Sequence, residues 1–233
     1  MESIFRETAR DAHSAARTGE LHLPHGTVES PAFMPVGTAA TVKAIHHARV
    51  RELGYRLILG NTYHLYLRPG TEVIADHGGL HGFSSWEDNI LTDSGGYQVF
   101  SLADLRRISD EGVRFQSHVD GSRHLFTPES VVDAQVAFNS DIQMALDVCT
   151  GFGVSEREAV QALETTTRWA RRAFEQWQRR REEGYAGALF GIVQGNFFPE
   201  LRRRSAEEIA ALEFPGLAIG GLSVGEEPGL FRD

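Results

Sequence analysis

The stretch Leu91-Thr-Asp-Ser-Gly-Gly-Tyr-Gln-Val-Phe100 joins an apolar lead-in to an acid, a hydroxyl and two glycines. The lead-in is typical of the last residues of a buried strand, and Gly95 and Gly96 allow a tight turn or a close approach to a ligand. Asp93 and Ser94 then lie at the end of that strand. Taken alone, these two residues suit equally well the cap of a helix that begins near Tyr97.

Strands that end in polar residues or glycine recur along the chain. Buried strands are predicted at 32–36, 55–59, around 90, and at 141–147, 188–194 and 216–224. Helical spacing predicts helices at 39–53, 71–76, 127–139, 155–183 and 198–212. The residues at or just after the strand ends are Asn61, Asp93, Asp147, Gln194 and Gly221. This alternation of strands and helices predicts an α/β fold with a parallel sheet.

Two further segments indicate β-hairpins. One runs from Arg17 to Val36 about a Pro-His-Gly turn and leads into the first core strand. The other is an inserted hairpin from Val113 to Phe126, with an Asp-Gly turn at Asp120.

The parallel sheet is either doubly wound or closed into a (β/α)8 TIM barrel. The barrel is favoured because polar residues end many strands and no Gly-x-Gly-x-x-Gly follows the first one. A barrel has eight βα units, and about six are counted here. Residues 1–233 are therefore expected to form a single incomplete TIM-barrel catalytic domain that breaks off within an element at 228–233.

The composition is that of an ordinary globular protein, with 233 residues, 41% hydrophobic and 24% charged. The net charge of −9 argues against a nucleic-acid partner, because Lys and Arg supply most phosphate contacts. A single cysteine, Cys149, excludes an intramolecular disulfide and a Cys-rich zinc site. Neither a signal peptide nor an 18-residue apolar run is found, so no membrane contact and a cytoplasmic location are expected.

The strand-end residues together describe a pocket for a nucleobase. Asp93 and Asp147 offer two carboxylates for proton transfer and for recognition of N–H groups. Gln194 offers both a donor and an acceptor, and a glycine N–H at Gly220 or Gly221 can approach a planar ligand closely. Tyr97 adds a face for stacking. This set suits a base with adjacent N–H groups and a carbonyl, as guanine has.

Six motifs in this order resemble the bacterial-type tRNA-guanine transglycosylases, also called queuine tRNA-ribosyltransferases. They are Gly60-Asn-Thr-Tyr-His-Leu65, Leu91-Thr-Asp-Ser-Gly-Gly-Tyr-Gln98, His118-Val-Asp-Gly-Ser-Arg-His124, Met144-Ala-Leu-Asp-Val-Cys-Thr150, Gly191-Ile-Val-Gln-Gly195 and Gly220-Gly-Leu-Ser-Val-Gly-Glu226. The resemblance spans the whole chain, which looks like the N-terminal two-thirds of such an enzyme. It implies a pentosyltransferase of queuosine biosynthesis on a (β/α)8 barrel. Such enzymes exchange guanine at the tRNA wobble position for a 7-deazaguanine through a covalent intermediate.

The resemblance also implies roles for single residues. Asp93 matches the catalytic proton acceptor. The substrate-binding loop matches Asp93, Ser94, Gly95, Gly96 and Tyr97. The groups that read the base match Asp147, Gln194 and Gly221.

Four further residues complete the implied pocket. Cys149 and Val224 match the bacterial pattern of a pocket open to the aminomethyl base prequeuosine-1. Leu222 contributes backbone contacts, and Asn61 lies near the reacting centre.

Two parts of the family pattern have no counterpart in this sequence. These are the nucleophilic aspartate of a later strand and a structural zinc held by three Cys and one His, so the zinc-binding subdomain is expected to be absent and no cofactor is expected here. The first hypothesis is an enzyme represented by an incomplete chain that is inactive alone. The alternative is a non-catalytic partner subunit or base-binding protein. An aldolase-like barrel is disfavoured because Lys43, the only lysine, does not end a strand.

The expected partners are tRNA with guanine at the wobble position and guanine or prequeuosine-1, and a homodimer remains open. Three arginine-rich runs, 171–172, 179–181 and 202–204, are interpreted as solvated helix faces more readily than as phosphate contacts.

Overall fold

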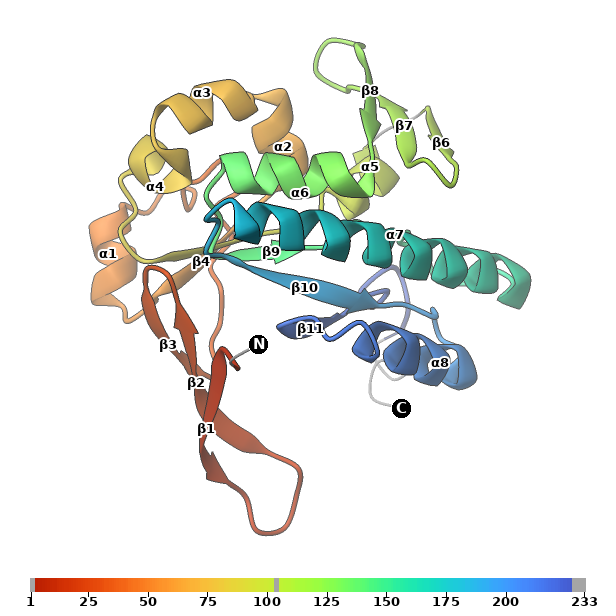
Figure 1. The fold of residues 1–233 in the computed structure, drawn as a ribbon, viewed down its shortest axis with the longest axis horizontal. Helices are drawn as coiled ribbons and strands as arrows, with labels where there is room; N and C mark the ends of the chain where they lie inside the picture. Colours follow the sequence, from red (N-terminus) through yellow and green to blue (C-terminus); the bar gives the residue numbers. More distant parts are fainter. Residues whose placement is uncertain (1–2, 103–104, 228–233) are drawn as a thin grey trace. The chain divides into compact units, whose positions relative to one another are not determined.

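The computed structural model describes residues 3–102 and 105–227. Its contacts divide the chain into two compact units. The first comprises residues 1–93, 134–143 and 184–188, and the second comprises 94–133, 144–183 and 189–233. Figure 1 gives the order of the elements along the chain. The predicted break within an element at 228–233 lies outside the described residues.

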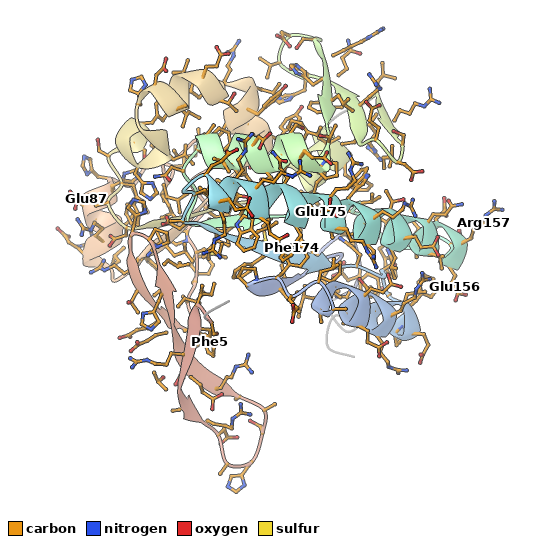
Figure 2. The ribbon with its side chains drawn as sticks, viewed as in Figure 1. Phe5, Glu87, Glu156, Arg157, Phe174 and Glu175 are labelled. Carbon is orange, nitrogen blue, oxygen red and sulfur yellow. The ribbon has the colours of Figure 1, made fainter. Side chains whose placement is uncertain are left out.

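The first unit begins with a three-stranded antiparallel sheet in the order β1-β2-β3. The predicted hairpin is confirmed as β2 (Arg17–Leu23) and β3 (Gly26–Ser30). The third strand, β1 (Phe5–Arg10), was not predicted and pairs with β2. Figure 2 labels Phe5 at its start.

Parallel strands form the centre of the first unit. β4 (Leu57–Gly60) pairs with β5 (Asn89–Thr92), and β5 pairs with the start of β9 (Ile142–Met144). All three were predicted, although β9 is shorter than expected. The strand predicted at 32–36 is wrong, because only an isolated bridge joins Val36 to Leu59. Proline lacks the N–H group that a ladder needs, and Pro31 and Pro35 bracket this segment.

The helix predicted at 39–53 is also largely wrong, because only α1 (His47–Glu52) forms there. Ala40 and Ala44 have left-handed φ angles of 63°, which interrupt a right-handed helix. α3 (Thr71–Asp76) has the predicted bounds. α2 (Thr62–Leu67) and α4 (Gly79–Ser84) were not predicted. The core of this unit is an apolar cluster whose largest members are Ile58, Leu65, Ile74, Leu80, Trp86, Ile90 and Phe138.

The second unit contains β10 (Ala188–Val193) and β11 (Gly216–Ile219), which pair in parallel from Phe190–Gly216 to Val193–Ile219. The predicted helices are present as α7 (Glu156–Glu182) and α8 (Pro199–Ala210). Ser155 caps α7, because its hydroxyl accepts from the Glu158 backbone while the Glu158 side chain accepts from the Ser155 backbone.

An apolar seam holds α7 against α8. Ala159 and Leu163 of α7 pack with Leu201 of α8. Near the other end of α7, the ring centroid of Phe174, labelled in Figure 2, lies 5.1 Å from that of Phe214. Full burial of a side chain such as Leu or Phe contributes about 1.5–3 kcal/mol to the stability of the fold.

The inserted hairpin is confirmed as β7 (Val113–Gln116) and β8 (Arg123–Phe126), and β6 (Arg106–Ile108) adds a third antiparallel strand to it. α5 (Gly96–Leu102) precedes this small sheet, and α6 (Pro128–Ala137) follows it. The Thr127 hydroxyl accepts from the Ser130 backbone at 3.1 Å, so the predicted cap of α6 is confirmed.

Parallel strands therefore occur in both units, with β4 beside β5 and β5 beside β9 in the first, and β10 beside β11 in the second. This confirms the predicted α/β class with a central parallel sheet. Among residues 3–102 and 105–227, no helix combines the length and apolar character needed to cross a bilayer.

Candidate functional site

In the second unit, Asp147 is the centre of a buried polar cluster. The Gln194 amide Nε2 donates to Asp147 Oδ2 at 2.6 Å, and the Ser94 hydroxyl donates to Asp147 Oδ1 at 3.1 Å. Gln194 follows the last residue of β10, and its backbone N–H donates to Ser205 Oγ of α8 at 2.9 Å. All three cluster residues are buried, with exposed fractions of 9% or less. The structure thus brings Asp147 and Gln194, both predicted to read a base, into direct contact.

Glycines allow the backbone to approach this cluster. A Cβ atom on Gly221 would lie 2.6 Å from Gln194 Oε1, and one on Gly96 would lie 2.9 Å from the Asp147 carbonyl oxygen. Gly221 also has φ of +70°, which side-chain-bearing residues rarely adopt. The Gly96 N–H donates to Ser94 Oγ at 3.1 Å. Gly96 is therefore required for space, and Gly221 for both space and conformation.

A small cavity adjoins the cluster. Its lining includes Gly96, Asp147 and Cys149 together with Arg106 and Trp169. Burial, and then the negative charge of Asp147, raises the pKa of the Cys149 thiol to about 12. Cys149 is therefore a neutral thiol near pH 7 and lines the cavity as a small apolar side chain rather than as a nucleophile.

Three further predicted residues of the second unit are Tyr97, Leu222 and Val224. Tyr97 is 49% exposed, so part of its surface is accessible. Leu222 is half-buried. The carbonyl oxygen of Val224 accepts from the Phe152 N–H at 3.2 Å.

In the first unit, Asp93 follows β5 and is held by the segment after β4. Asn61 Nδ2 donates to Asp93 Oδ2 at 2.5 Å, and the Thr62 N–H donates to Asp93 Oδ1 at 2.8 Å. The Thr62 hydroxyl donates to the Asp93 carbonyl oxygen at 2.5 Å. The structure thus brings Asn61 and Asp93 together and fixes the carboxylate in one orientation, which suits an acceptor of protons.

Sequence reasoning missed a second buried carboxylate in the first unit. Asp141, which is 1% exposed, accepts from His25 Nδ1 at 2.6 Å and from the Ile90 N–H at 2.7 Å. His81 Nε2 lies 3.1 Å from Asp141 Oδ2 and 3.0 Å from the Asp88 carbonyl oxygen. No motif spacing reveals this cluster, because His25 and Asp141 are 116 residues apart.

The ligand atoms of His25, His81 and Asp141 lie within 4.8 Å of one another, which makes them the metal-like grouping of the described residues. The two imidazole rings are stacked, however, with centroids 3.6 Å apart and an interplanar angle of 17°. The nitrogen lone pairs of His25 and His81 lie in the planes of these two nearly parallel rings, so they do not converge on one ion. We therefore assign hydrogen bonding, and not metal coordination, to this cluster.

A structural zinc with three Cys and one His ligand does not fit these residues, because Cys149 is the only cysteine in the 233 residues.

The chain matches one protein family over most of its length. The profile of the family described as "Queuine tRNA-ribosyltransferase" matches residues 11–232. Among curated proteins, the queuine tRNA-ribosyltransferase of Treponema denticola is 57% identical over 230 residues, which is 99% of this chain and 60% of that protein. Those of Borrelia hermsii and Pelotomaculum thermopropionicum are 55% and 56% identical, over 96% and 95% of this chain and 59% of each relative. The chain therefore spans about 60% of the length of the curated relatives it matches.

Proposed function

The chain belongs to the queuine tRNA-ribosyltransferase family, and from this premise we propose that the protein exchanges guanine at the wobble position of tRNA for a 7-deazaguanine. Such an exchange is a pentosyl transfer in queuosine biosynthesis, carried out on cytoplasmic tRNA. Its chemistry requires a pocket that reads the edge of guanine and a group that moves a proton. The buried cluster around Asp147 and the partly buried cluster around Asp93 are suited to these tasks.

The contact between Asp147 and Gln194 is the observation that carries this proposal. A carboxylate accepts from adjacent N–H groups, and a neighbouring amide offers both a donor and an acceptor. Guanine presents N–H groups and a carbonyl on one edge. When the base binds, it takes over hydrogen bonds that Gln194 and Ser94 now make to Asp147. The N–H of Gly221 adds a donor at a position where no side chain fits.

We assign proton transfer to Asp93. Its two carboxylate oxygens are oriented by Asn61 and by the Thr62 N–H. Tyr97, with half of its surface exposed, is assigned the stacking face of the base. The covalent nucleophile of the family has no counterpart among residues 1–233, so we propose that these residues bind the base but do not complete the exchange alone.

We also propose the (β/α)8 barrel as the architecture of the complete protein. A doubly wound sheet reverses its strand order at a switch point, whereas a barrel adds each strand beside its predecessor. Within each unit the parallel strands follow the second pattern, β4 beside β5 beside β9 in the first and β10 beside β11 in the second.

The preferred base is proposed to be prequeuosine-1. This proposal rests on the resemblance of Cys149 and Val224 to the bacterial pairing that admits an aminomethyl group but not the cyclopentenediol of queuine, and Cys149 contributes a small, neutral side chain to the cavity wall. In competition with labelled guanine, prequeuosine-1 should be used well and queuine poorly. Equal use of both bases would contradict this assignment.

The test of the overall function is incorporation of labelled guanine into tRNA. We expect none with residues 1–233 and clear incorporation with a polypeptide extended to the length of the relatives. In the extended polypeptide, Asp93→Asn should lower the rate about 100-fold or more, because general acid–base groups contribute about 10²–10⁴. Lack of incorporation by the extended, folded polypeptide would reject the function.

A further inference from the structure

The small sheet β6–β7–β8 carries an arginine-rich outer face. Val113 and Phe115 of β7 are buried beneath it, and Arg114 between them is exposed, as alternation along a strand requires. Arg107 of β6 lies directly opposite Arg114, and Arg123 of β8 pairs with the outward-facing Gln116. We call the exposed set of Arg107, Arg114 and Arg123 the arginine face.

This face is part of an open groove. The groove is lined by residues of all three strands, including the arginine face, Arg106 and Leu125. Leu105, also in its lining, is 68% exposed. The groove thus combines guanidinium groups with apolar surface, the combination that lets a protein hold phosphates and contact sugars or bases in the same place.

The charges of the face are unbalanced within the protein. Like charges directly opposite each other in neighbouring strands are destabilising, and Arg107 and Arg114 form such a pair. The three strands themselves contain no acidic residue. Arg114 has one ion pair, with Glu111 at 2.9 Å, in which both side chains are more than half exposed. Within residues 3–102 and 105–227, Arg107 and Arg123 have no ion-pair partner.

Three arginines of the helix runs differ in this respect. Arg172 pairs with Glu129 at 2.7 Å, Arg180 pairs with Asp133 at 2.8 Å, and Arg204 pairs with Glu208 at 2.7 Å. These three guanidinium groups are thus engaged by the protein's own acids. In a chain with 23 basic and 32 acidic residues, an exposed arginine cluster whose strands carry no acid and in which only Arg114 is paired suits an anionic partner.

The groove also adjoins the candidate base pocket. Arg106 lines both the groove and the cavity that contains Asp147 and Cys149. Ile108 of β6 and Val113 of β7 line that cavity too. Arg106 is held in place by Phe100 of α5, whose ring centroid lies 4.6 Å from its guanidinium carbon. The same small sheet therefore forms one wall of the cavity and presents the arginine face.

We propose that the arginine face binds the sugar–phosphate backbone of the RNA strand whose base enters the Asp147 cavity. This inference rests on the proposed function, since it takes tRNA as the substrate. Guanidinium groups bind phosphate oxygens in a bidentate manner and stack on bases, so three of them on neighbouring strands position a flexible strand without reading its sequence. The backbone then fixes where the wobble nucleotide lies.

The test uses the protein in its natural length and a triple variant, Arg107→Gln, Arg114→Gln and Arg123→Gln. Its matched control replaces three exposed helix arginines, Arg157→Gln, Arg171→Gln and Arg203→Gln, so that both variants lose the same charge. The dissociation constant for tRNA is measured at several salt concentrations, and guanine binding is measured without RNA. Arg157 is labelled on α7 in Figure 2.

The triple variant should bind tRNA about 10–100-fold more weakly than the control. Its slope of log affinity against log salt should be smaller by about 2, because each single-stranded phosphate contact contributes about 0.7. Guanine binding without RNA should be unchanged. Equal tRNA affinity and equal salt slope in the two variants would overturn the inference. A triple variant that loses binding to anionic vesicles but keeps its binding of tRNA would also overturn it.

Two further arms keep the result interpretable. If the triple variant fails to fold, Arg107→Gln and Arg123→Gln are tested singly, and each should weaken tRNA binding severalfold relative to Arg157→Gln. Failure of the unchanged protein to bind tRNA would reject the proposed function and this inference together. Normal tRNA binding and guanine exchange in the unchanged protein, with no effect of the single variants, would reject this inference alone.

Discussion

Two buried aspartates flank strand β9, and their surroundings differ in kind. Asp141 directly precedes the strand and is held by two histidine rings and the Ile90 N–H. Asp147 follows the strand by three residues and is held by the flexible side chains of Gln194 and Ser94. The partners of Asp141 belong to the scaffold, whereas those of Asp147 adjoin glycines and a cavity.

The comparison separates structural from functional use of the same residue type. In parallel α/β folds, ligands bind at the carboxyl ends of strands, while polar groups at the amino ends serve stability. Asp141 is therefore expected to stabilise the fold, and Asp147 is expected to bind the base. Four substitutions test this division. Each variant can be compared in two measurements, the free energy of unfolding and the affinity for guanine.

Asp141→Asn should have the largest effect. The change removes one charge from a buried hydrogen-bonded set. It also replaces one carboxylate oxygen by an NH2 group, so either the Ile90 N–H or a histidine faces a donor where it needs an acceptor. The free energy of unfolding should fall by about 3–5 kcal/mol. Urea denaturation measures it, with the exposed Asp76→Asn as the control. A loss below about 1 kcal/mol would remove the structural role of Asp141.

Cys149 should react slowly because its pKa is raised to about 12 from 9.0. At pH 8 the folded protein should be alkylated about 1,000-fold more slowly at this residue than the urea-unfolded chain, as followed by mass spectrometry of the labelled peptide. The unfolded chain releases this proton first, so the thiol also makes stability fall as the pH rises from 9 toward 12.

The charge of Asp147 contributes to that raised pKa, so Asp147→Asn should speed the alkylation of Cys149. An alkylation rate in the folded protein equal to that of the unfolded chain would show that Cys149 does not lie in the wall of a closed cavity beside Asp147.

Gly221→Ala should weaken guanine binding about 5–20-fold. The added methyl group would lie 2.6 Å from Gln194 Oε1, so the amide must turn away from Asp147. Displacement of one hydrogen bond costs about 1 kcal/mol, and the left-handed backbone adds a similar amount. Gly153→Ala is a matched control, since φ there is +84° and no atom lies within 4 Å of the added carbon. Equal affinities in both variants would exclude contact between Gly221 and the base-reading amide.

Ser94→Ala should have the smallest effect. It removes the 3.1 Å hydrogen bond to Asp147 and the acceptor for the Gly96 N–H. The free energy of unfolding should fall by about 0.5–1.5 kcal/mol, measured by the same denaturation as for Asp141→Asn. A loss as large as that of Asp141→Asn would mean that the Asp147 cluster is structural as well.

The sequence allowed prediction of the Asp147 cluster but not of the Asp141 cluster, for a physical reason. Asp147 and Gln194 each follow a strand, and parallel strands bring their carboxyl ends together without further information. His25 lies in a hairpin turn and His81 in a short helix. The contacts of these two histidines with Asp141 depend on tertiary packing, which leaves no periodic pattern in the sequence.

The errors in the predicted fold have similar origins. Helical spacing from 39 to 53 was read as one helix, but left-handed residues at Ala40 and Ala44 leave only α1. Proline at 31 and 35 reduced a predicted strand to one bridge. The long helix α7 and the hairpin of β7 and β8 were predicted because caps and an Asp-Gly turn are local signals.

The most direct test is a guanine titration of Asp147→Asn beside Asp141→Asn in the protein at its natural length, under conditions where both remain folded. We predict that Asp147→Asn lowers guanine affinity by about 2–4 kcal/mol, because a charged acceptor is replaced by a group that is partly a donor. Asp141→Asn should bind guanine as the unchanged protein does. Unchanged affinity in Asp147→Asn, or lost affinity in folded Asp141→Asn, would contradict the assignment of base recognition to the carboxyl end of β9.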